Sequence, residues 1–418
     1  MWPMSTRLLC MLLLLAFPAV AKPPQEGSLT FPREFETLFH ATLDFYGQLQ
    51  RTTNGLYRDA FVINPAAAPS HICSTAATGV GLMALCMDFE LSRDPAAPQK
   101  ALQTLHAINR KITGFGIARE KAGYLQHFFS SQDGSGKSSH STVDTAILVV
   151  GALFCRNTFT NQQIRAEADQ LWNSIEWSVA LAKPNGEQLY MVVEDGKPRE
   201  ASKTFLFNEY YVLAWLIKES QLEKTGHSAV LPIKELNTWD NQGLKLLCCN
   251  GPWPECSFLV QFPFYMCHPC VSDPLYREFV LAQAKADQRA CSQRTGVAEF
   301  WGCGAGGTPT RGYRANHYAN NPDNVVSPHI IAGFMPVFPL AQEHLLKLYH
   351  DPQRRVQTPV GALLPRFSVD KPDWHAPRIE AIDYASMLFG LAGIHPRLGM
   401  KFFDDKTTFT FNKELRHP

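Results

Sequence analysis

One acidic residue stands inside an almost wholly apolar stretch. Residues 205–215 read Phe-Leu-Phe-Asn-Glu-Tyr-Tyr-Val-Leu-Ala-Trp, so that Asn208 and Glu209 lie side by side. A helix of this composition is buried around most of its circumference, and a carboxylate is seldom fully buried without a partner. Glu209 is therefore either a paired core residue or a carboxyl group that faces an internal cleft. In a cleft, loss of hydration raises the carboxyl pKa toward neutrality, which a general acid requires.

Two further acids occupy comparable positions. Asp144 lies in the first turn of an apolar helix predicted over residues 141–153, and Asp383 lies near the start of one predicted over 380–390. Asp144 also has a simpler interpretation, in which its charge offsets the positive end of the helix dipole. Glycoside hydrolysis requires two carboxyl groups, one protonated and one ionised. Together with aromatic loop residues whose faces can stack on sugar rings, these acids favour a carbohydrate ligand.

Other catalytic classes leave no comparable pattern in the chain. There is no Gly-x-Ser-x-Gly elbow and no His-Glu-x-x-His motif. The glycine-rich run 300–307 neither follows a predicted strand nor opens a predicted helix, so it is not expected to bind phosphate. The histidines are scattered and are expected to be structural. We therefore expect no metal and no cofactor.

The first residues predict export. A short basic segment, an apolar run over 8–17 and small residues at Ala19 and Ala21 are typical of a secretory signal peptide, residues 1–21, cut before Lys22. Later apolar runs are too short to span a membrane. The formal net charge of +1, with both signs mixed along the chain, argues against nucleic acid or an anionic membrane surface as a partner. We expect a secreted monomer, extracellular or periplasmic.

The cysteine count carries a second expectation. Of 11 cysteines, Cys10 belongs to the signal peptide, which leaves ten. An even number in an exported protein favours disulfides. The cysteines between 248 and 270 also permit a zinc site, but a paired Cys-x-x-Cys pattern is incomplete there, so disulfides are favoured.

Helical periodicity dominates the remaining sequence. Ten to twelve helices are predicted, joined by polar or aromatic loops, among them one over 232–247 in place of any strand. The small residues of a helix over 73–85 indicate close packing. No linker divides the chain, so residues 22–418 are predicted to form one domain. The fold class expected is all-α, a closed (α/α)6 barrel of six helical hairpins with long active-site loops at the N-termini of its inner helices.

Several stretches resemble one known family. The matching segments are residues 73–85, Ser-Thr-Val-Asp-Thr-Ala-Ile-Leu at 141–148, Asn208-Glu209, Asn54-Gly55-Leu56 with Asp59, Gly114-Phe115-Gly116, Phe300-Trp301-Gly302, Val326-Ser327-Pro328 and Ile382-Asp383. In this order they resemble the glycoamylase-like domain family, which includes the endo-β-1,2-glucanases. The resemblance covers almost the whole mature chain.

The resemblance implies an inverting glycoside hydrolase on an (α/α)6 barrel. Glu209 would be the general acid and Asp383 the general base. The residues expected to bind substrate are Asp59, Asp133, Asp144, Asn208, Tyr210, Trp301, Tyr313 and Trp374.

The substrate implied is β-1,2-glucan. Two alternatives remain: a hydrolase of another glucan, such as an α-glucan, on the same barrel, and a non-catalytic glycan-binding protein that has kept the fold.

Overall fold

The computed structural model describes residues 31–64, 66, 68–183, 186–225, 231–249, 251, 254–356 and 358–412. The predicted signal peptide lies outside these ranges. Within them there are thirteen α-helices, and strands are limited to two-stranded sheets. None of the described helices is long and apolar enough to cross a membrane.

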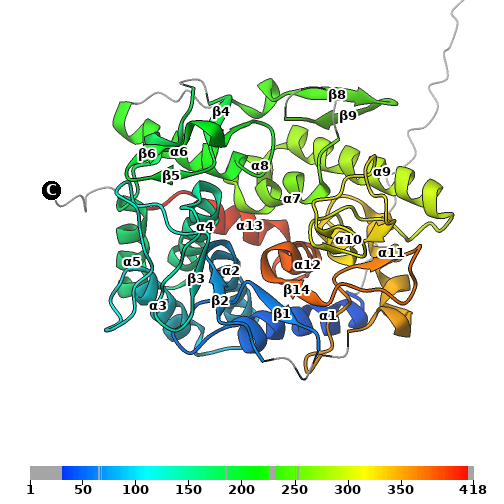
Figure 1. The fold of residues 1–418 in the computed structure, drawn as a ribbon, viewed down its shortest axis with the longest axis horizontal. Helices are drawn as coiled ribbons and strands as arrows, with labels where there is room; N and C mark the ends of the chain where they lie inside the picture. Colours follow the sequence, from blue (N-terminus) through cyan, green and yellow to red (C-terminus); the bar gives the residue numbers. More distant parts are fainter. Residues whose placement is uncertain are drawn as a thin grey trace, which may run out of the picture.

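Six helices follow one another in a closed ring near the centre of the molecule (Figure 1). In ring order they are α2 (Thr75–Glu90), α4 (Thr142–Thr158), α6 (Tyr211–Thr225), α7 (Ser257–Met266), α10 (Pro328–Gly333) and α12 (Ala381–Ile394). Each contacts the next, and α12 contacts α2. The described side chains of α2, α4 and α12 are buried on nearly all sides, as their apolar composition predicts.

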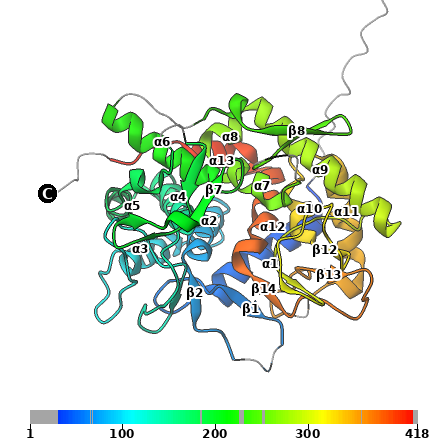
Figure 2. The ribbon, with the colours of Figure 1, turned by 45° about the horizontal axis from the view of Figure 1, so that its top comes forward.

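Five helices lie outside this ring (Figures 1 and 2). They are α1 (Arg33–Asp44), α3 (Ala97–Ile108), α5 (Gln162–Asn173), α9 (Pro274–Thr295) and α11 (Pro339–His350). Each packs on an inner helix with one apolar face; α1, for example, buries Phe35, Leu38 and Phe39. The short helix α8 (His268–Ser272) and α13 (Gly399–Thr407) complete the set, and α13 contacts α4, α7 and α12. The architecture is therefore a helical toroid.

The helix predicted over 232–247 is wrong. The described part of this connection forms a short 3₁₀ turn (Ile233–Glu235) and a hairpin of β8 (Thr238–Asn241) and β9 (Leu244–Leu247). The two residues between the strands, Gln242 and Gly243, both have positive φ, the conformation of a two-residue hairpin turn. Five inner helices thus follow an outer helix in the chain, whereas α7 follows this hairpin.

Six other antiparallel sheets join the loops. Their pairs are β1 (Ala60–Val62) with β14 (Arg378–Glu380), β2 (Ile72–Ser74) with β3 (Phe128–Ser130), β4 (Gln188–Tyr190) with β7 (Lys203–Phe205), β5 (Val193–Glu194) with β6 (Lys197–Pro198), β10 (Gly307–Thr308) with β11 (Gly312–Tyr313), and β12 (Val325–Val326) with β13 (Phe367–Ser368). The strands β2 and β14 lead directly into α2 and α12, so the sheets fix how those helices begin.

Glycines allow the inner helices to approach closely. A Cβ on Gly79 of α2 would lie 2.5 Å from the carbonyl oxygen of Ile147 in α4, and one on Gly390 of α12 would collide with the backbone of Ala332 in α10. Ser74 caps α2 by accepting a hydrogen bond from the Ala77 backbone N–H. The close packing predicted from the small residues of 73–85 is confirmed.

The predicted disulfides are absent from the described residues, where all ten cysteines are free. The Sγ atoms of Cys86 and Cys155 are 3.7 Å apart and those of Cys291 and Cys303 are 3.4 Å apart, against about 2.05 Å for a bond. Nine of the ten are buried, where a thiol packs as a small apolar group. The cysteine count alone could not distinguish this use from covalent pairing.

Candidate active site

Acidic residues gather at the beginnings of four inner helices. Asp144 and Asp383 lie in the first turns of α4 and α12, Glu209 lies two residues before α6, and Glu255 lies two residues before α7. The charges of Glu255 and Asp144 both contribute to the pKa of Glu209, so these three carboxyl groups lie within electrostatic reach of one another. The ring of inner helices therefore brings together acids that are far apart in the sequence.

Glu209 is held by the turn that joins β7 to α6. The Asn208 amide donates to Thr204 Oγ1 at 2.7 Å, and its oxygen accepts the Tyr210 backbone N–H at 3.0 Å. Asn208 is therefore occupied in shaping the turn, although it was predicted to bind substrate. The helix begins at Tyr211, several residues later than the apolar run suggested, and Glu209 precedes it.

The environment of Glu209 suits a general acid. Its side chain keeps some exposure, yet loss of hydration raises its pKa to about 7, with smaller contributions from the charges of Glu255 and Asp144. Of the two interpretations left open by the sequence, the structure supports a carboxyl group that is desolvated without an ion-pair partner among the described residues. Such a group is protonated in a large fraction of molecules near neutral pH.

Asp383 is a second carboxyl with a raised pKa. Burial and the charge of Glu380 raise it to about 7, against the hydrogen bond from Tyr313 and the charge of Arg366. The Tyr313 hydroxyl donates to the carboxyl group and lies 3.1 Å from both of its oxygens, while the residue as a whole is 54% exposed. Tyr313 thus offers an aromatic face to solvent directly beside Asp383.

His127 pairs with Asp144 and lies within electrostatic reach of Asp59. Its Nδ1 lies 2.9 Å from Asp144 Oδ2. Burial lowers the pKa of His127, but the hydrogen bond to Asp144 and the charges of Asp144 and Asp59 outweigh this and raise it. The Asp59 carbonyl accepts the backbone N–H of Ala381, the first residue of α12. These interactions relate the α4 side of the acidic cluster to the α12 side.

Of the remaining predicted site residues, the structure keeps Tyr210 beside the acids and gives Trp301, Asp133 and Trp374 no contact with them among the described residues. Trp301 is fully buried and donates its indole N–H to His344 at 2.9 Å, so its predicted role in stacking on a sugar is wrong for this structure. Tyr210 is buried next to Glu209, whose charge helps to raise its pKa well above the usual range. Asp133 is exposed and accepts from Ser135, and Trp374 is half-buried in the loop before β14. No described contact joins either residue to the acids.

Sequence reasoning missed four charged residues that the fold places near the acids: His127, Glu255, Arg366 and Glu380. Glu380 directly precedes α12 and pairs with Arg378 at 2.8 Å. Since all four lie in loops or at strand ends, no periodic pattern marked them.

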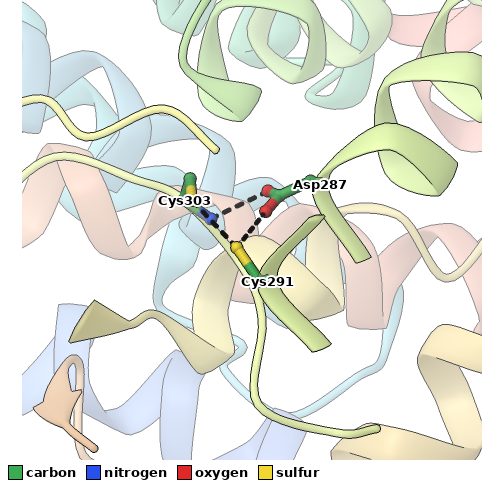
Figure 3. A group of neighbouring side chains, drawn as sticks. All are labelled: Asp287, Cys291 and Cys303. Carbon is green, nitrogen blue, oxygen red and sulfur yellow. Dashed lines mark hydrogen bonds between the residues drawn. The ribbon is translucent and has the colours of Figure 1, made fainter. Parts of the chain in front are cut away.

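One group of side chains has the composition of a metal site. Asp287 and Cys291 of α9 are buried together with Cys303 of the loop that follows this helix (Figure 3). Asp287 already accepts hydrogen bonds from Ser257 at 2.6 Å, from the Cys303 backbone N–H at 2.8 Å and from Cys291 at 3.2 Å. In addition, the Arg294 guanidinium lies 3.3 Å from Cys291 Sγ. A saturated carboxylate and a neighbouring cation make this cluster a hydrogen-bonded link between α9 and the loop after it.

Similarity to known proteins lies in the fold. At the level of sequence, no protein-family model and no curated protein matches this chain. An endo-β-1,2-glucanase from Chitinophaga pinensis, in complex with sophorotriose and glucose, superposes with a TM-score of 0.74 at 18% identity, over 90% of this chain and 95% of that one. A glucoamylase-like protein from Bacteroides uniformis gives a TM-score of 0.75 at 18% identity, over 91% and 96%.

A more distant fungal structure extends the comparison. An endo-β-1,2-glucanase mutant from Talaromyces funiculosus, bound to β-1,2-glucan, gives a TM-score of 0.64 at 11% identity over 89% of this chain and 85% of that one. The chain therefore has the fold of these proteins along nearly its full described length. Its structural neighbours are the proteins that the sequence resemblance indicated, endo-β-1,2-glucanases and glucoamylase-like proteins.

Proposed function

We propose that this protein is an inverting glycoside hydrolase that cleaves β-1,2-glucan at its internal linkages, with Glu209 as general acid and Asp383 as general base. One observation carries the proposal: two carboxyl groups with pKa values near 7 stand at the beginnings of α6 and α12, in the fold of endo-β-1,2-glucanases. An inverting hydrolase requires two such groups on opposite faces of the sugar.

The mechanism transfers one proton at each carboxyl group. Glu209, protonated, gives its proton to the glycosidic oxygen as the bond to C1 breaks. Asp383, ionised, takes a proton from the water whose oxygen bonds to C1 from the opposite face. The anomeric configuration is inverted, and the two carboxyl groups end in exchanged protonation states. Tyr313 orients Asp383 through its hydroxyl group, and its exposed ring offers a surface for a sugar at the base side.

Substrate binding falls to residues around the same cluster. Asp144, paired with His127, and Asp59, which lies within electrostatic reach of His127, can accept hydrogen bonds from sugar hydroxyls on the α4 side. Asp133 and Trp374 would bind sugar units of a glucan that extends across the loops that carry them. No metal and no cofactor takes part in this chemistry.

The finer fold and the location belong to the same proposal. We infer an (α/α)6 barrel in which the β8–β9 hairpin stands where the sixth outer helix would be expected. We also infer a secreted monomer released by cleavage near Ala21.

A panel of polysaccharides tests the substrate. Purified mature protein is incubated with linear β-1,2-glucan, β-1,3-glucan and starch, and the products are separated by length. The proposal predicts oligosaccharides of several lengths from β-1,2-glucan alone, with the new reducing ends of inverted configuration in an NMR time course. Glucose released from starch would instead favour the α-glucan alternative, which the glucoamylase-like neighbour supports.

A further inference from the structure

A buried positive charge lies close to the candidate base. Arg366 precedes β13 and is 1% exposed. Its Nη1 reaches the carbonyl oxygen of Arg314 at 3.4 Å, whereas Nε and Nη2 are sealed from solvent and have no hydrogen-bond partner in the described part of the protein. Buried N–H groups of a cation are costly to leave unpaired, so these two donors require a partner that is not a protein side chain.

A buried acceptor without a hydrogen-bond partner, Nε2 of His329, lies within electrostatic reach of Arg366. His329 is in α10, and its Nδ1 lies 2.9 Å from the carbonyl oxygen of Pro365. Burial and the charge of Arg366 lower the pKa of His329 to about 3, so the ring is neutral. A neutral ring that donates from Nδ1 to a carbonyl has a free lone pair on Nε2, and this atom too has no partner within the described ranges.

The glycine-rich run is shaped around these two side chains. A Cβ on Gly306 would lie 2.8 Å from Arg366 Cδ, and Gly306 has a φ of +130°. A Cβ on Gly304 would lie 3.1 Å from His329 Nε2. The run that the sequence left without a role therefore leaves room for Arg366 and His329 beneath the loop that leads to Tyr313.

Arg366 is connected to the neighbourhood of Asp383 by geometry as well as by charge. Its Nη1 reaches the carbonyl oxygen of Arg314, the residue after Tyr313, and the Tyr313 hydroxyl donates to Asp383. The largest charge interaction of Arg366 is with Asp383, followed by Cys303, Glu380 and Tyr313. Arg366 and Asp383 are nevertheless not in direct contact, since no ion pair within 4 Å joins them. The guanidinium and the carboxyl group therefore interact electrostatically without a direct hydrogen bond. An ordered water commonly bridges two polar groups at such a separation.

We propose that Arg366 and His329 hold an ordered internal water next to Asp383, and that through this water and its own charge Arg366 is the positioning residue that favours the ionised form of the base. The water would accept from Arg366 and donate to His329 Nε2 and to the Asp383 carboxylate. These are three polar partners, as a buried water requires. Neither Arg366 nor His329 gains or loses a proton. The role in catalysis rests on the proposed function; the water site does not.

Asp383 is surrounded by groups of both signs. The titratable and charged groups that interact with it are Glu380, Asp59, Tyr313, Arg366 and Tyr46, and Arg378 neutralises Glu380. Of these, Arg366 is the buried cation, and no carboxylate of the described residues forms an ion pair with it. Its removal therefore leaves Asp383 beside uncompensated negative charge.

Two readouts test the proposal in the full-length mature protein. In Arg366→Gln, the acidic limb of the kcat/KM profile is expected to move up by about one pH unit, because a nearby cation lowers a carboxyl pKa by roughly one to three units. Arg366→Lys is expected to restore most of that shift. If activity falls equally at all pH values while the limb stays in place, Arg366 is merely structural and the proposal is overturned.

The second readout needs no substrate. The stability difference between wild type and Asp383→Asn is followed by denaturant unfolding from pH 5 to 9, and the same difference is measured in the Arg366→Gln background. This stability difference changes with pH as Asp383 titrates. The proposal predicts that the midpoint of that change moves upward by about one pH unit in the Arg366→Gln background. If the midpoint moves although no glucan is hydrolysed, the proposed function fails and the site stands; an unmoved midpoint overturns the site.

Two glycine variants and a crystal structure provide further tests in case Arg366 variants do not fold. Gly306→Ala is expected to displace Arg366 and to shift the acidic limb upward, whereas Gly307→Ala, whose Cβ would be 3.9 Å from its nearest neighbour, is the matched control. A high-resolution crystal structure is expected to show density within hydrogen-bond distance of Arg366, His329 and Asp383. A direct Arg366–Asp383 ion pair without water would overturn the proposal.

Discussion

Replacing Glu209 by glutamine is expected to stabilise the protein at high pH. The pKa of Glu209 is raised from 4.5 to about 7, so the folded protein binds this proton more tightly than the unfolded chain does. As pH rises from about 4 to 7 the unfolded chain releases the proton first, and folding stability is lost over that window. A shift of about 2.5 units corresponds to roughly 3 kcal/mol above pH 7. Glutamine has no charge to desolvate and avoids this loss.

The assay compares urea unfolding of wild type and Glu209→Gln at pH 5 and pH 8. The variant is expected to gain about 2 to 3 kcal/mol more at pH 8 than at pH 5, because most of the charged form appears between these values. Glu343→Gln is the control, since Glu343 is an exposed residue of α11 that pairs with Lys347, and it should show no such gain. Equal stability changes at both pH values for Glu209→Gln would mean that Glu209 is well hydrated, and would remove the physical basis for its role as an acid.

Three further outcomes follow from the structure. With both carboxyl pKa values near 7, the kcat/KM profile on glucan should be a narrow bell, about 25-fold lower at pH 5 and pH 9 than at pH 7; a flat profile would contradict the assignment of both residues. Trp301→Phe should lower the free energy of unfolding by about 1 kcal/mol, because the hydrogen bond from the indole to His344 is lost. KM for glucan should stay unchanged; a raised KM would show that Trp301 contributes to substrate binding. Gly390→Ala should lower the free energy of unfolding by about 1 to 3 kcal/mol, because the new Cβ forces α12 away from α10. Gly47→Ala is the control, since a Cβ there meets nothing within 4 Å. Thermal unfolding of both variants should show a loss of stability only for Gly390→Ala.

The helices and the acids could be predicted because each has a local signature. In the sequence, Asp144 and Asp383 each stand at the beginning of an apolar helix, and the small residues near Gly79 indicate that helices pack closely there. The β8–β9 hairpin was missed because its turn, Gln242-Gly243, lacks the Asn-Gly or Asp-Gly signal.

Other features depend on contacts between distant segments. His127 directly precedes β3 and pairs with Asp144 of α4, and Arg366 reaches the neighbourhood of Asp383 from a separate loop. Trp301 was placed in the site from its aromatic character and its motif, which do not distinguish a sugar platform from a core residue.

The most direct measurement is reducing-sugar release from linear β-1,2-glucan by the wild type and by Glu209→Gln at pH 7. A general acid contributes about 10² to 10⁴ in rate, so we expect rapid release by the wild type and a loss of that size in the variant, with the fold retained by circular dichroism. Release that is unchanged by Glu209→Gln would show that Glu209 is not the general acid, and no release by the wild type would show that β-1,2-glucan is not the substrate.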